Sequence, residues 1–275
     1  FVVADYYGKV IPKTILFWGH NPIVTGPDGE LSFLVQRALK AGSFGIAIDP
    51  RRSETAQRCQ MWLPIRPGTD AALALAMAHV IIQEGLYDHE FVEKWTVGFE
   101  RLKAHVSTYT PQWAETITWI PAEDIVTAAK RYALDKPSVL EWGVAIEHTP
   151  NSLQTVRAIA LLRGLTGNID IPGGDILGMN IVRPYPVLRQ HLPKDAVKKR
   201  IGGEEFKLLG GFRAYLPSAH VPGIFKAMRT GEPYRIRALL NFGSNPLVTV
   251  ANAQEVYQSL LKLDLLAVAD MFMTP

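Results

Sequence analysis

The sequence has very little cysteine, net charge or unbroken apolar length. Cys59 is the one cysteine among 275 residues, so neither a disulfide framework nor a cysteine metal cage can be built from it. The longest apolar run, residues 71–82, is broken by His79 and is too short to span a bilayer. The formal net charge of +3 argues against nucleic acid as a partner. With 48% hydrophobic and 20% charged residues, the chain is expected to fold around a substantial core.

The common nucleotide-binding and catalytic motifs are also missing. Neither the Gly-x-Gly-x-x-Gly of nicotinamide enzymes nor the Gly-x-x-x-x-Gly-Lys-Ser/Thr of P-loop proteins occurs. Residues 89–93 lack the second histidine of a zinc-protease helix, and residues 41–45 place a glycine beside the serine, unlike a nucleophile elbow. These absences argue against an ordinary nicotinamide-binding enzyme and against a self-contained catalytic set.

Short apolar runs alternate with amphipathic stretches over the first 84 residues. This alternation predicts a parallel sheet with helices on both faces, and ligands of such sheets sit at the carboxyl ends of the strands. Thr69 is expected to cap the second helix. The predicted strands are 14–18, 44–48 and 61–65, the predicted helices are 30–41 and 71–84, and the strand-end loops are 19–22, 49–52 and 67–70.

A second lobe is expected from about residue 136, after a run of short helices. It begins with a predicted strand at 138–142 and a helix from about 151 to 165, and then has a proline-rich, irregular connection at 176–222. Order is expected to return with a strand, a helix and a strand at 237–241, 251–262 and 265–269. The sequence therefore predicts an α/β protein of two doubly wound, Rossmann-like lobes: an inserted lobe at 12–135 and a second lobe at 136–275.

The most informative feature is an internal repeat. Residues 19–25 read Gly-His-Asn-Pro-Ile-Val-Thr and residues 243–249 read Gly-Ser-Asn-Pro-Leu-Val-Thr. Each copy follows a predicted strand and precedes a helix and a second strand, which ends on Asp49 or Asp270. A glycine lets backbone approach a ligand, and a strand-end carboxylate can accept paired N–H groups or ribose hydroxyls. One copy would be an ordinary turn, whereas two with matching flanks favour paired ligand cradles in pseudo-symmetric lobes.

With these motifs the chain resembles the central part of the molybdopterin oxidoreductases of the dimethyl sulfoxide reductase type, which include formate dehydrogenases and nitrate reductases. The resemblance covers most of residues 12–275. It is strongest over four stretches, and its most specific motifs are Pro-Gly-Thr-Asp at 67–70 and Leu-Thr-Gly-Asn-Ile followed by Pro-Gly-Gly within 165–174. The four stretches are 15–22, 46–70, 161–174 and 239–275.

The resemblance implies a cofactor and a set of residues that line it. The family binds two molybdopterin guanine dinucleotides on one molybdenum or tungsten, one in each lobe, and carries out two-electron redox chemistry or oxygen-atom transfer. His148 is implied as a possible active-site contact, and Gly143 and Asn151 are implied to lie near the pyrophosphate or pterin. The implied nucleotide-lining residues are Gly19, His20, Asn21, Asp49, Arg51, Gly68 and Asp70 for one dinucleotide, and Gly243, Ser244, Asn245 and Asp270 for the other.

The resemblance also implies what lies outside the chain. The iron–sulfur region, the protein ligand of the metal and a closing domain have no counterpart here, so we expect an inactive central fragment of an enzyme. Its partners are expected to be a small-molecule substrate and an iron–sulfur electron-transfer subunit. Cys59 is expected to be a buried structural thiol rather than the metal ligand.

The chain departs from the family's motif at one position, and two alternative functions are open. Asp170 stands where the family's Asn-Ile-Gly-x-Pro-Gly-Gly has glycine, so the turn is expected to differ. One rival is a non-redox hydratase of the same family. The other is a structural or electron-transfer subunit that has lost its metal, and the paired aspartates argue against it because an empty site has no need for them.

Overall fold

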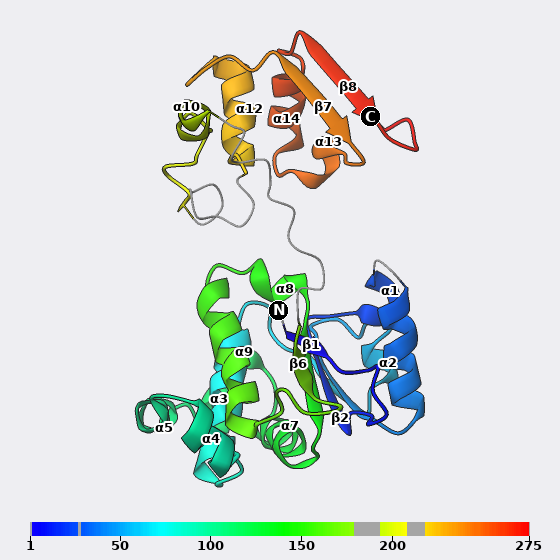
Figure 1. Ribbon diagram of the computed structural model, residues 1–275, viewed down its shortest axis with the longest axis vertical. Coiled ribbons are helices and arrows are strands. Elements are labelled where there is room, and N and C mark those ends of the chain that lie inside the picture. Colours follow the sequence, from blue (N-terminus) through cyan, green and yellow to red (C-terminus); the bar gives the residue numbers. More distant parts are fainter. Residues whose placement is uncertain (1, 27–28, 179–192, 208–217, 275) are drawn as a thin grey trace. The chain divides into compact units, whose positions relative to one another are not determined.

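The computed structural model describes residues 2–26, 29–178, 193–207 and 218–274. The chain divides into two compact units, Phe1–Met179 and Asn180–Pro275. Each unit contains a parallel arrangement of strands with helices packed beside it (Figure 1). The α/β class expected from the sequence is confirmed.

The first unit is built on a four-stranded parallel sheet with the strand order β4-β3-β2-β5. Trp18 at the end of β2 pairs with Ile48 on one side and Trp142 on the other. The chain adds β3 and β4 on one side of β2 and then returns to add β5 on the other. The strand order therefore reverses between β2 and β5, which makes a topological switch point. These strands are β2 (Thr14–Trp18), β3 (Phe44–Ile48), β4 (Met61–Leu63) and β5 (Ser138–Trp142).

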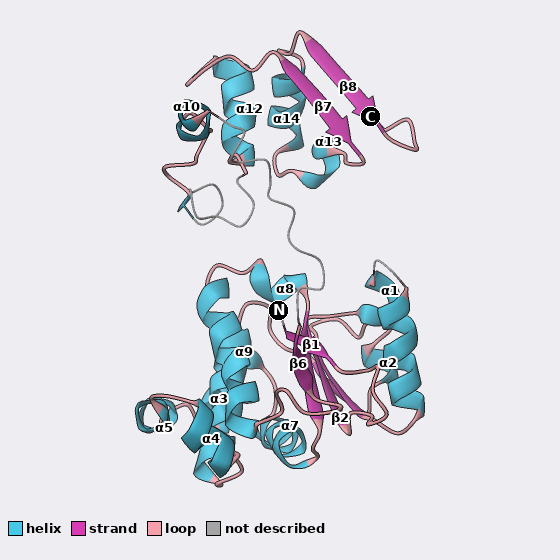
Figure 2. Ribbon diagram, in the orientation of Figure 1, coloured by secondary structure: helices cyan, strands magenta, loops and turns pink. Residues whose placement is uncertain are grey.

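Helices cover both faces of this sheet (Figure 2). Because successive strand residues point to opposite faces, Ile15 and Phe17 pack toward Val35 of helix α2, whereas Leu16 and Trp18 belong to the core on the other face. Helix α2 spans Glu30–Lys40, and the helices of the opposite face are α3 (Asp70–Gln83), α7 (Ala122–Leu134) and α9 (Ser152–Thr166).

Shorter elements complete the first unit. Strand β1 pairs antiparallel with β6, and α4 to α7 follow one another between β4 and β5, as the sequence predicts for residues 89–135. The bounds are β1 (Val2–Ala4), β6 (Asp175–Leu177), α1 (Pro22–Thr25), η1 (Ala56–Arg58), α4 (His89–Trp95), α5 (Phe99–Val106), α6 (Pro111–Thr118) and α8 (Val144–Glu147).

Three expectations are corrected. Strand β5 pairs with β2 over five residues, so it belongs to the first sheet, and the boundary expected at 135/136 falls at 179/180 instead. The helices before β5 form a crossover between two strands of one sheet. Thr69 does not cap α3 through its side chain, because its hydroxyl donates to the carbonyl of Arg66. Asp170 adopts φ +59°, the left-handed conformation for which glycine is favoured, so the backbone at this position is one that a glycine would adopt without strain.

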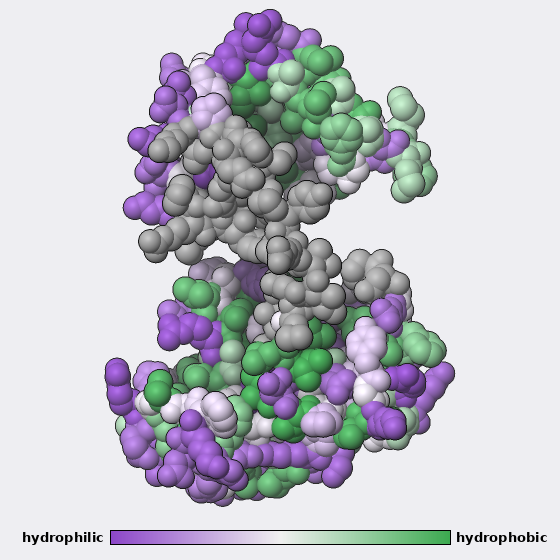
Figure 3. All heavy atoms as spheres, viewed as in Figure 1, coloured by the Kyte–Doolittle hydropathy of each residue, from purple (hydrophilic) through white to green (hydrophobic). Residues whose placement is uncertain are grey.

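The second unit carries a two-stranded parallel sheet, β7 (Ala238–Phe242) with β8 (Leu265–Ala269). Its small core joins Phe225 and Met228 to Val256, and every residue of β8 is exposed. Apolar side chains accordingly gather at the surface over β7 and β8 (Figure 3). Parts of the expected irregular connection, 179–192 and 208–217, lie outside the described residues. The helices are α10 (Lys194–Lys198), α12 (Val221–Thr230), α13 (Pro246–Thr249) and α14 (Ala253–Leu260).

Candidate functional site

The two repeated loops have the same backbone geometry. Gly19 and Gly243 both adopt φ +56°, a conformation that costs a side-chain-bearing residue about 1–2 kcal/mol. The amide of Gly19 donates to the carbonyl of Ile48 at 2.8 Å, and that of Gly243 donates to the carbonyl of Ala269 at 2.9 Å. Each glycine thus ties its loop to the last residue of the neighbouring strand, at the carboxyl end of its sheet.

The Asn-Pro-x-Val-Thr segments after these glycines form equivalent short helices, α1 and α13. The Asn21 carbonyl accepts the hydroxyl of Thr25 at 2.9 Å, and the Asn245 carbonyl accepts the hydroxyl of Thr249 at 3.0 Å. In both copies proline stands in the first turn, where its missing N–H leaves no bond unmade. The sequence repeat is therefore also a structural repeat.

The strand-end aspartates match as well. Asp49 accepts the amide of Arg51 at 2.8 Å, and Asp270 accepts the amide of Phe272 at 3.2 Å. Each carboxylate is held by the turn that follows its own strand, beside the repeated loop. Arg51 is exposed and lies 3.7 Å from Glu54, so its ion pair with Glu54 is weak.

The two asparagine side chains form different hydrogen bonds. Asn21 is 9% exposed; its Oδ1 accepts the amide and hydroxyl of Thr55 at 3.1 and 2.7 Å, and its Nδ2 donates to Glu54 at 2.8 Å. Asn245 instead caps its own helix by accepting the amide of Leu247 at 3.1 Å. Asn21 therefore joins the loop after β2 to the segment after β3. Ser244 is exposed beside Asn245.

The Pro-Gly-Thr-Asp loop contributes one open and one buried residue. Gly68 has φ +81° and open space around its α-carbon. Asp70 lies in the first turn of α3, 6% exposed, and accepts the indole N–H of Trp18 at 2.9 Å. Burial raises the pKa of the Asp70 carboxyl, although the Trp18 hydrogen bond opposes this. The position of Asp70 thus ties α3 to the end of β2.

Gly143 brings the ends of β5 and β2 together. Its amide donates to the Trp18 carbonyl at 2.9 Å, and a Cβ added there would lie 2.1 Å from the carbonyl oxygen of Gly19, so only glycine fits. His148 and Asn151 are exposed at the end of α8 and the start of α9. The structure therefore gathers Gly19, His20 and Gly143 at the switch point and leaves His148 on the surface.

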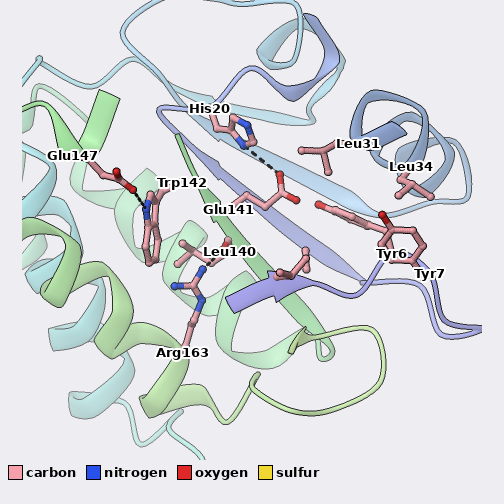
Figure 4. A pocket seen from close by; sticks show the side chains of 12 residues that line it. Tyr6, Tyr7, His20, Leu31, Leu34, Leu140, Glu141, Trp142, Glu147 and Arg163 are labelled. Atoms are coloured by element: carbon pink, nitrogen blue, oxygen red, sulfur yellow. Dashed lines mark hydrogen bonds and ion pairs between the residues drawn. The ribbon is translucent and has the colours of Figure 1, made fainter. Parts of the chain in front are cut away.

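A cavity of about 520 Å³ lies at this switch point (Figure 4). His20 enters it from the loop after β2, and its Nδ1 lies 3.3 Å from Oε2 of Glu141 on β5. The hydroxyl of Tyr6, which follows β1, points toward the same carboxylate. The Tyr6 hydroxyl and His20 Nδ1 thus both face Glu141, and these three buried polar groups are one another's partners. Sequence reasoning missed Tyr6 and Glu141; the signal was a charged residue at an alternate position of an apolar strand.

Arg163, which lines this cavity, belongs to a buried ion pair. Arg163 Nε lies 2.6 Å from Asp175 Oδ2, and the Arg163 guanidinium also donates to the Leu140 carbonyl and stacks 4.4 Å over the Trp142 ring. The Trp142 indole donates to Glu147 at 3.1 Å. Burial raises the pKa of Asp175 to about 6, although the Arg163 charge opposes the rise.

In the part of the chain that the structure describes, no three histidine, cysteine or acidic side chains gather closely enough to hold a metal ion. No helix of that part is long and apolar enough to cross a membrane. Cys59 is partly buried, and burial raises the pKa of its thiol to about 12.

Comparison with known proteins identifies the family. The model of the molybdopterin oxidoreductase family matches residues 11–275. The chain belongs to this family. The family resemblance expected from the strand-end loops is confirmed, and these loops are part of a molybdopterin oxidoreductase fold.

Individual relatives of this molybdopterin oxidoreductase chain have different activities. Acetylene hydratase of Syntrophotalea acetylenica is 37% identical over 264 residues, covering 88% of this chain and 36% of that protein. Formate dehydrogenase H of Escherichia coli is 32% identical, covering 94% and 37%. The solved acetylene hydratase from Pelobacter acetylenicus superposes with a TM-score of 0.82 at 32% identity, over the whole of this chain and 40% of that one. The chain thus spans less than half the length of these relatives.

Proposed function

We propose that this chain is the cofactor-binding core of a molybdenum or tungsten enzyme, and that each repeated loop holds the nucleotide end of one molybdopterin guanine dinucleotide. The observation that carries the proposal is the matching backbone geometry of the two loops. Gly19 and Gly243 share φ +56° and the same hydrogen bond to the neighbouring strand. Two loops with the same backbone geometry in a molybdopterin oxidoreductase chain suit two ligands of the same kind.

The residues present fit such a group. The space around Gly68 of the Pro-Gly-Thr-Asp loop and around Gly243 of the second repeated loop is open, so a ligand can approach the backbone closely at these two positions. Asp49 and Asp270 stand at the strand ends with their carboxylates oriented by the following turn. A carboxylate in that position can accept the paired N–H groups of guanine or two ribose hydroxyls.

In this proposal the chain binds and orients, while the cofactor carries the reaction. When bound, the metal group supplies two-electron redox chemistry or oxygen-atom transfer. The exposed guanidinium of Arg51 can neutralise pyrophosphate in this proposal. Hydrogen bonds of Asn21 hold the loop after β2 to the segment after β3, and the Gly143 amide holds the loop after β5 to the end of β2. An iron–sulfur cluster, a small-molecule substrate and an iron–sulfur electron-transfer subunit complete the proposal for the intact protein.

A second candidate is hydration without net redox change. The similarity to acetylene hydratase at 37% identity favours it, alongside the similarity to formate dehydrogenase H and to dimethyl sulfoxide reductase of Haemophilus influenzae at 36% identity over 69% of this chain. The strand-end loops serve both chemistries equally, since they hold the nucleotide ends and not the reacting atoms.

The test is the metal, pterin and guanine content of the intact protein. We expect molybdenum or tungsten, with one guanine nucleotide for each repeated loop, and we expect Asp49→Asn or Asp270→Asn to lower the guanine content. A folded intact protein with neither metal nor pterin would overturn the proposal in favour of a structural subunit. Reduction of an artificial electron acceptor, measured beside hydration of an alkyne, then separates the two chemistries.

A further inference from the structure

The loop between α4 and α5 holds two large apolar side chains in solvent. Trp95 is 76% exposed and Val97 is fully exposed. Hydrogen bonds within the loop fix its shape, because the amide and the hydroxyl of Thr96 donate to the carbonyl of Val92 at 3.3 and 2.7 Å. The two apolar side chains therefore project from a fixed loop. Apolar side chains that gather on a surface in this way mark interaction sites.

A hollow of about 240 Å³ lies between this loop and helix α9. Helix α4 packs against α9, so the loop after α4 and the exposed side of α9 belong to one corner of the first unit (Figure 1). Val97 lines the hollow from the loop, and Leu161 and Gly164 line it from α9. Leu161 is itself 40% exposed. The corner thus combines a projecting apolar loop with an apolar hollow.

The packing of the chain gives no reason for the glycine at position 164. Gly164 lies within α9, and a Cβ added there would meet no described atom within 4 Å. A glycine inside a helix costs about 0.5–1 kcal/mol relative to alanine. What a helical glycine does allow is the close approach of another backbone. The place that Gly164 leaves open faces the same hollow, which indicates an element from outside the described chain.

A second hollow, of about 520 Å³, lies between α4 and α5 and shares Thr96 and Gly98 with the first. Its charged lining residues include Glu93, Glu100 and Arg101, and within the described ranges these three have no ion pair. Glu90 and Lys94 of the same helix, in contrast, pair with each other at 2.7 Å. The rim of the corner therefore carries uncommitted charges of both signs.

We propose that this corner binds a second copy of the chain about a two-fold axis, with the loop of each copy in a hollow of the other. A two-fold contact uses the same patch on both copies, so the patch must be complementary to itself. A projecting apolar loop beside an apolar hollow meets this condition. The charges meet it too, because Arg101 of one copy can face Glu93 or Glu100 of the other, whereas a patch of one sign would repel its own copy. The inference does not depend on the proposed function.

Sedimentation velocity of the intact protein tests the dimer. We expect Val97→Asp to raise the dimer dissociation constant roughly tenfold or more, because it places a charge where an apolar side chain is buried on association. Leu134→Asp is the matched control, since Leu134 is also an exposed apolar residue of the first unit, and it should leave the dimer intact. Val268→Lys on the exposed strand β8 should leave it intact as well. A protein that is monomeric up to about 100 µM, or a dimer that Val97→Asp does not weaken, would overturn the inference.

Two further variants separate docking from an effect on folding. Gly164→Ala should raise the melting temperature, because alanine favours the helix and has room there, and should nevertheless weaken the dimer. Copies with Arg101→Glu and copies with Glu93→Arg and Glu100→Arg should each dimerise poorly alone and dimerise with each other when mixed. A Gly164→Ala protein that dimerises as tightly as the wild type would contradict the close approach at α9. A mixture that dimerises no better than its components would contradict the two-fold pairing of charges.

Discussion

Replacing Arg163 by methionine tests what holds the wall of the switch-point cavity. Arg163 is 5% exposed and combines an ion pair with Asp175 at 2.6 Å, a bond to the Leu140 carbonyl and stacking at 4.4 Å over Trp142. Methionine retains much of the apolar volume but leaves the Asp175 carboxylate buried without its counter-charge. Removing one partner of a buried pair costs about 3–5 kcal/mol, so we expect a loss of that size in the free energy of unfolding at pH 7.

The loss should depend on pH in a definite direction. Burial raises the pKa of Asp175 to about 6, above the value of about 4 for an unfolded aspartate. The folded state then binds the proton more readily, so the contribution of this group to stability is present below about pH 4 and is lost as the pH rises through about 6. Without Arg163 the largest influence that opposes the rise in pKa is removed, although the Leu140 amide still donates to the carboxyl, so the Asp175 carboxyl is neutral over more of this range. The destabilisation by Arg163→Met should therefore shrink between pH 7 and pH 5.

Urea denaturation followed by tryptophan fluorescence measures this directly. All 6 tryptophans fall within the unit Phe1–Met179, so the signal reports the unfolding of that unit. The double variant Arg163→Met with Asp175→Asn should recover at least about 1 kcal/mol, because it removes the isolated charge. A loss below about 1 kcal/mol that does not vary with pH would refute the reasoning and show that the pair is not needed to hold the wall.

Three further changes have definite expected outcomes. Gly143→Ala places a Cβ 2.1 Å from the Gly19 carbonyl oxygen and should lower the free energy of unfolding by about 1–3 kcal/mol; an unchanged urea midpoint would show that the two loops separate easily. Asp170→Gly relieves φ +59° and should change stability by less than about 1 kcal/mol, so a large fall in melting temperature would contradict the strain argument. In Asp70→Asn the acceptor for Trp18 remains and the charge is removed. Since burial raises the pKa of Asp70, the free energy of unfolding of the wild type falls as the pH rises through the folded-state pKa. The variant should therefore be more stable than the wild type at pH 7 but not at pH 4. A variant that is less stable at pH 7 would show that the carboxylate is itself stabilising.

Local structure could be predicted well from the sequence. The strands Thr14–Trp18 and Phe44–Ile48 and the helix Glu30–Lys40 agree with the expected ranges to within one residue, because short apolar runs ended by glycine or Asp-Pro leave little freedom. The repeat could be recognised for the same reason, since the conformation of Gly19 and of Gly243 is set by local residue types. The position of a strand within a sheet is a different matter. The expected position of strand β5 in the second lobe is wrong because the residues of a strand do not indicate which other strand it pairs with.

The sequence indicates the two repeated loops as candidate cradles, which remain a prediction, and gives no indication of the cavity. Asn21 was expected to contact ligand, but the structure commits its side chain to Thr55 and Glu54. The cavity draws Tyr6, His20 and Glu141 from three segments far apart in the sequence, and such a meeting depends on the strand order. Glu141 is a charged residue in an otherwise apolar strand, which the sequence does show. Its position in the cavity becomes apparent only when β5 is known to pair with β2.

The open parallel pair in the second unit has a consequence for handling the protein. Strand β8 is exposed along all its five residues and, within the described parts of the chain, pairs with β7 alone. Bare strand edges beside apolar side chains are templates for edge-to-edge association. Concentrated preparations of this chain by itself are therefore expected to self-associate through that unit, and a charged substitution on the exposed strand, such as Val268→Lys, is expected to reduce this association.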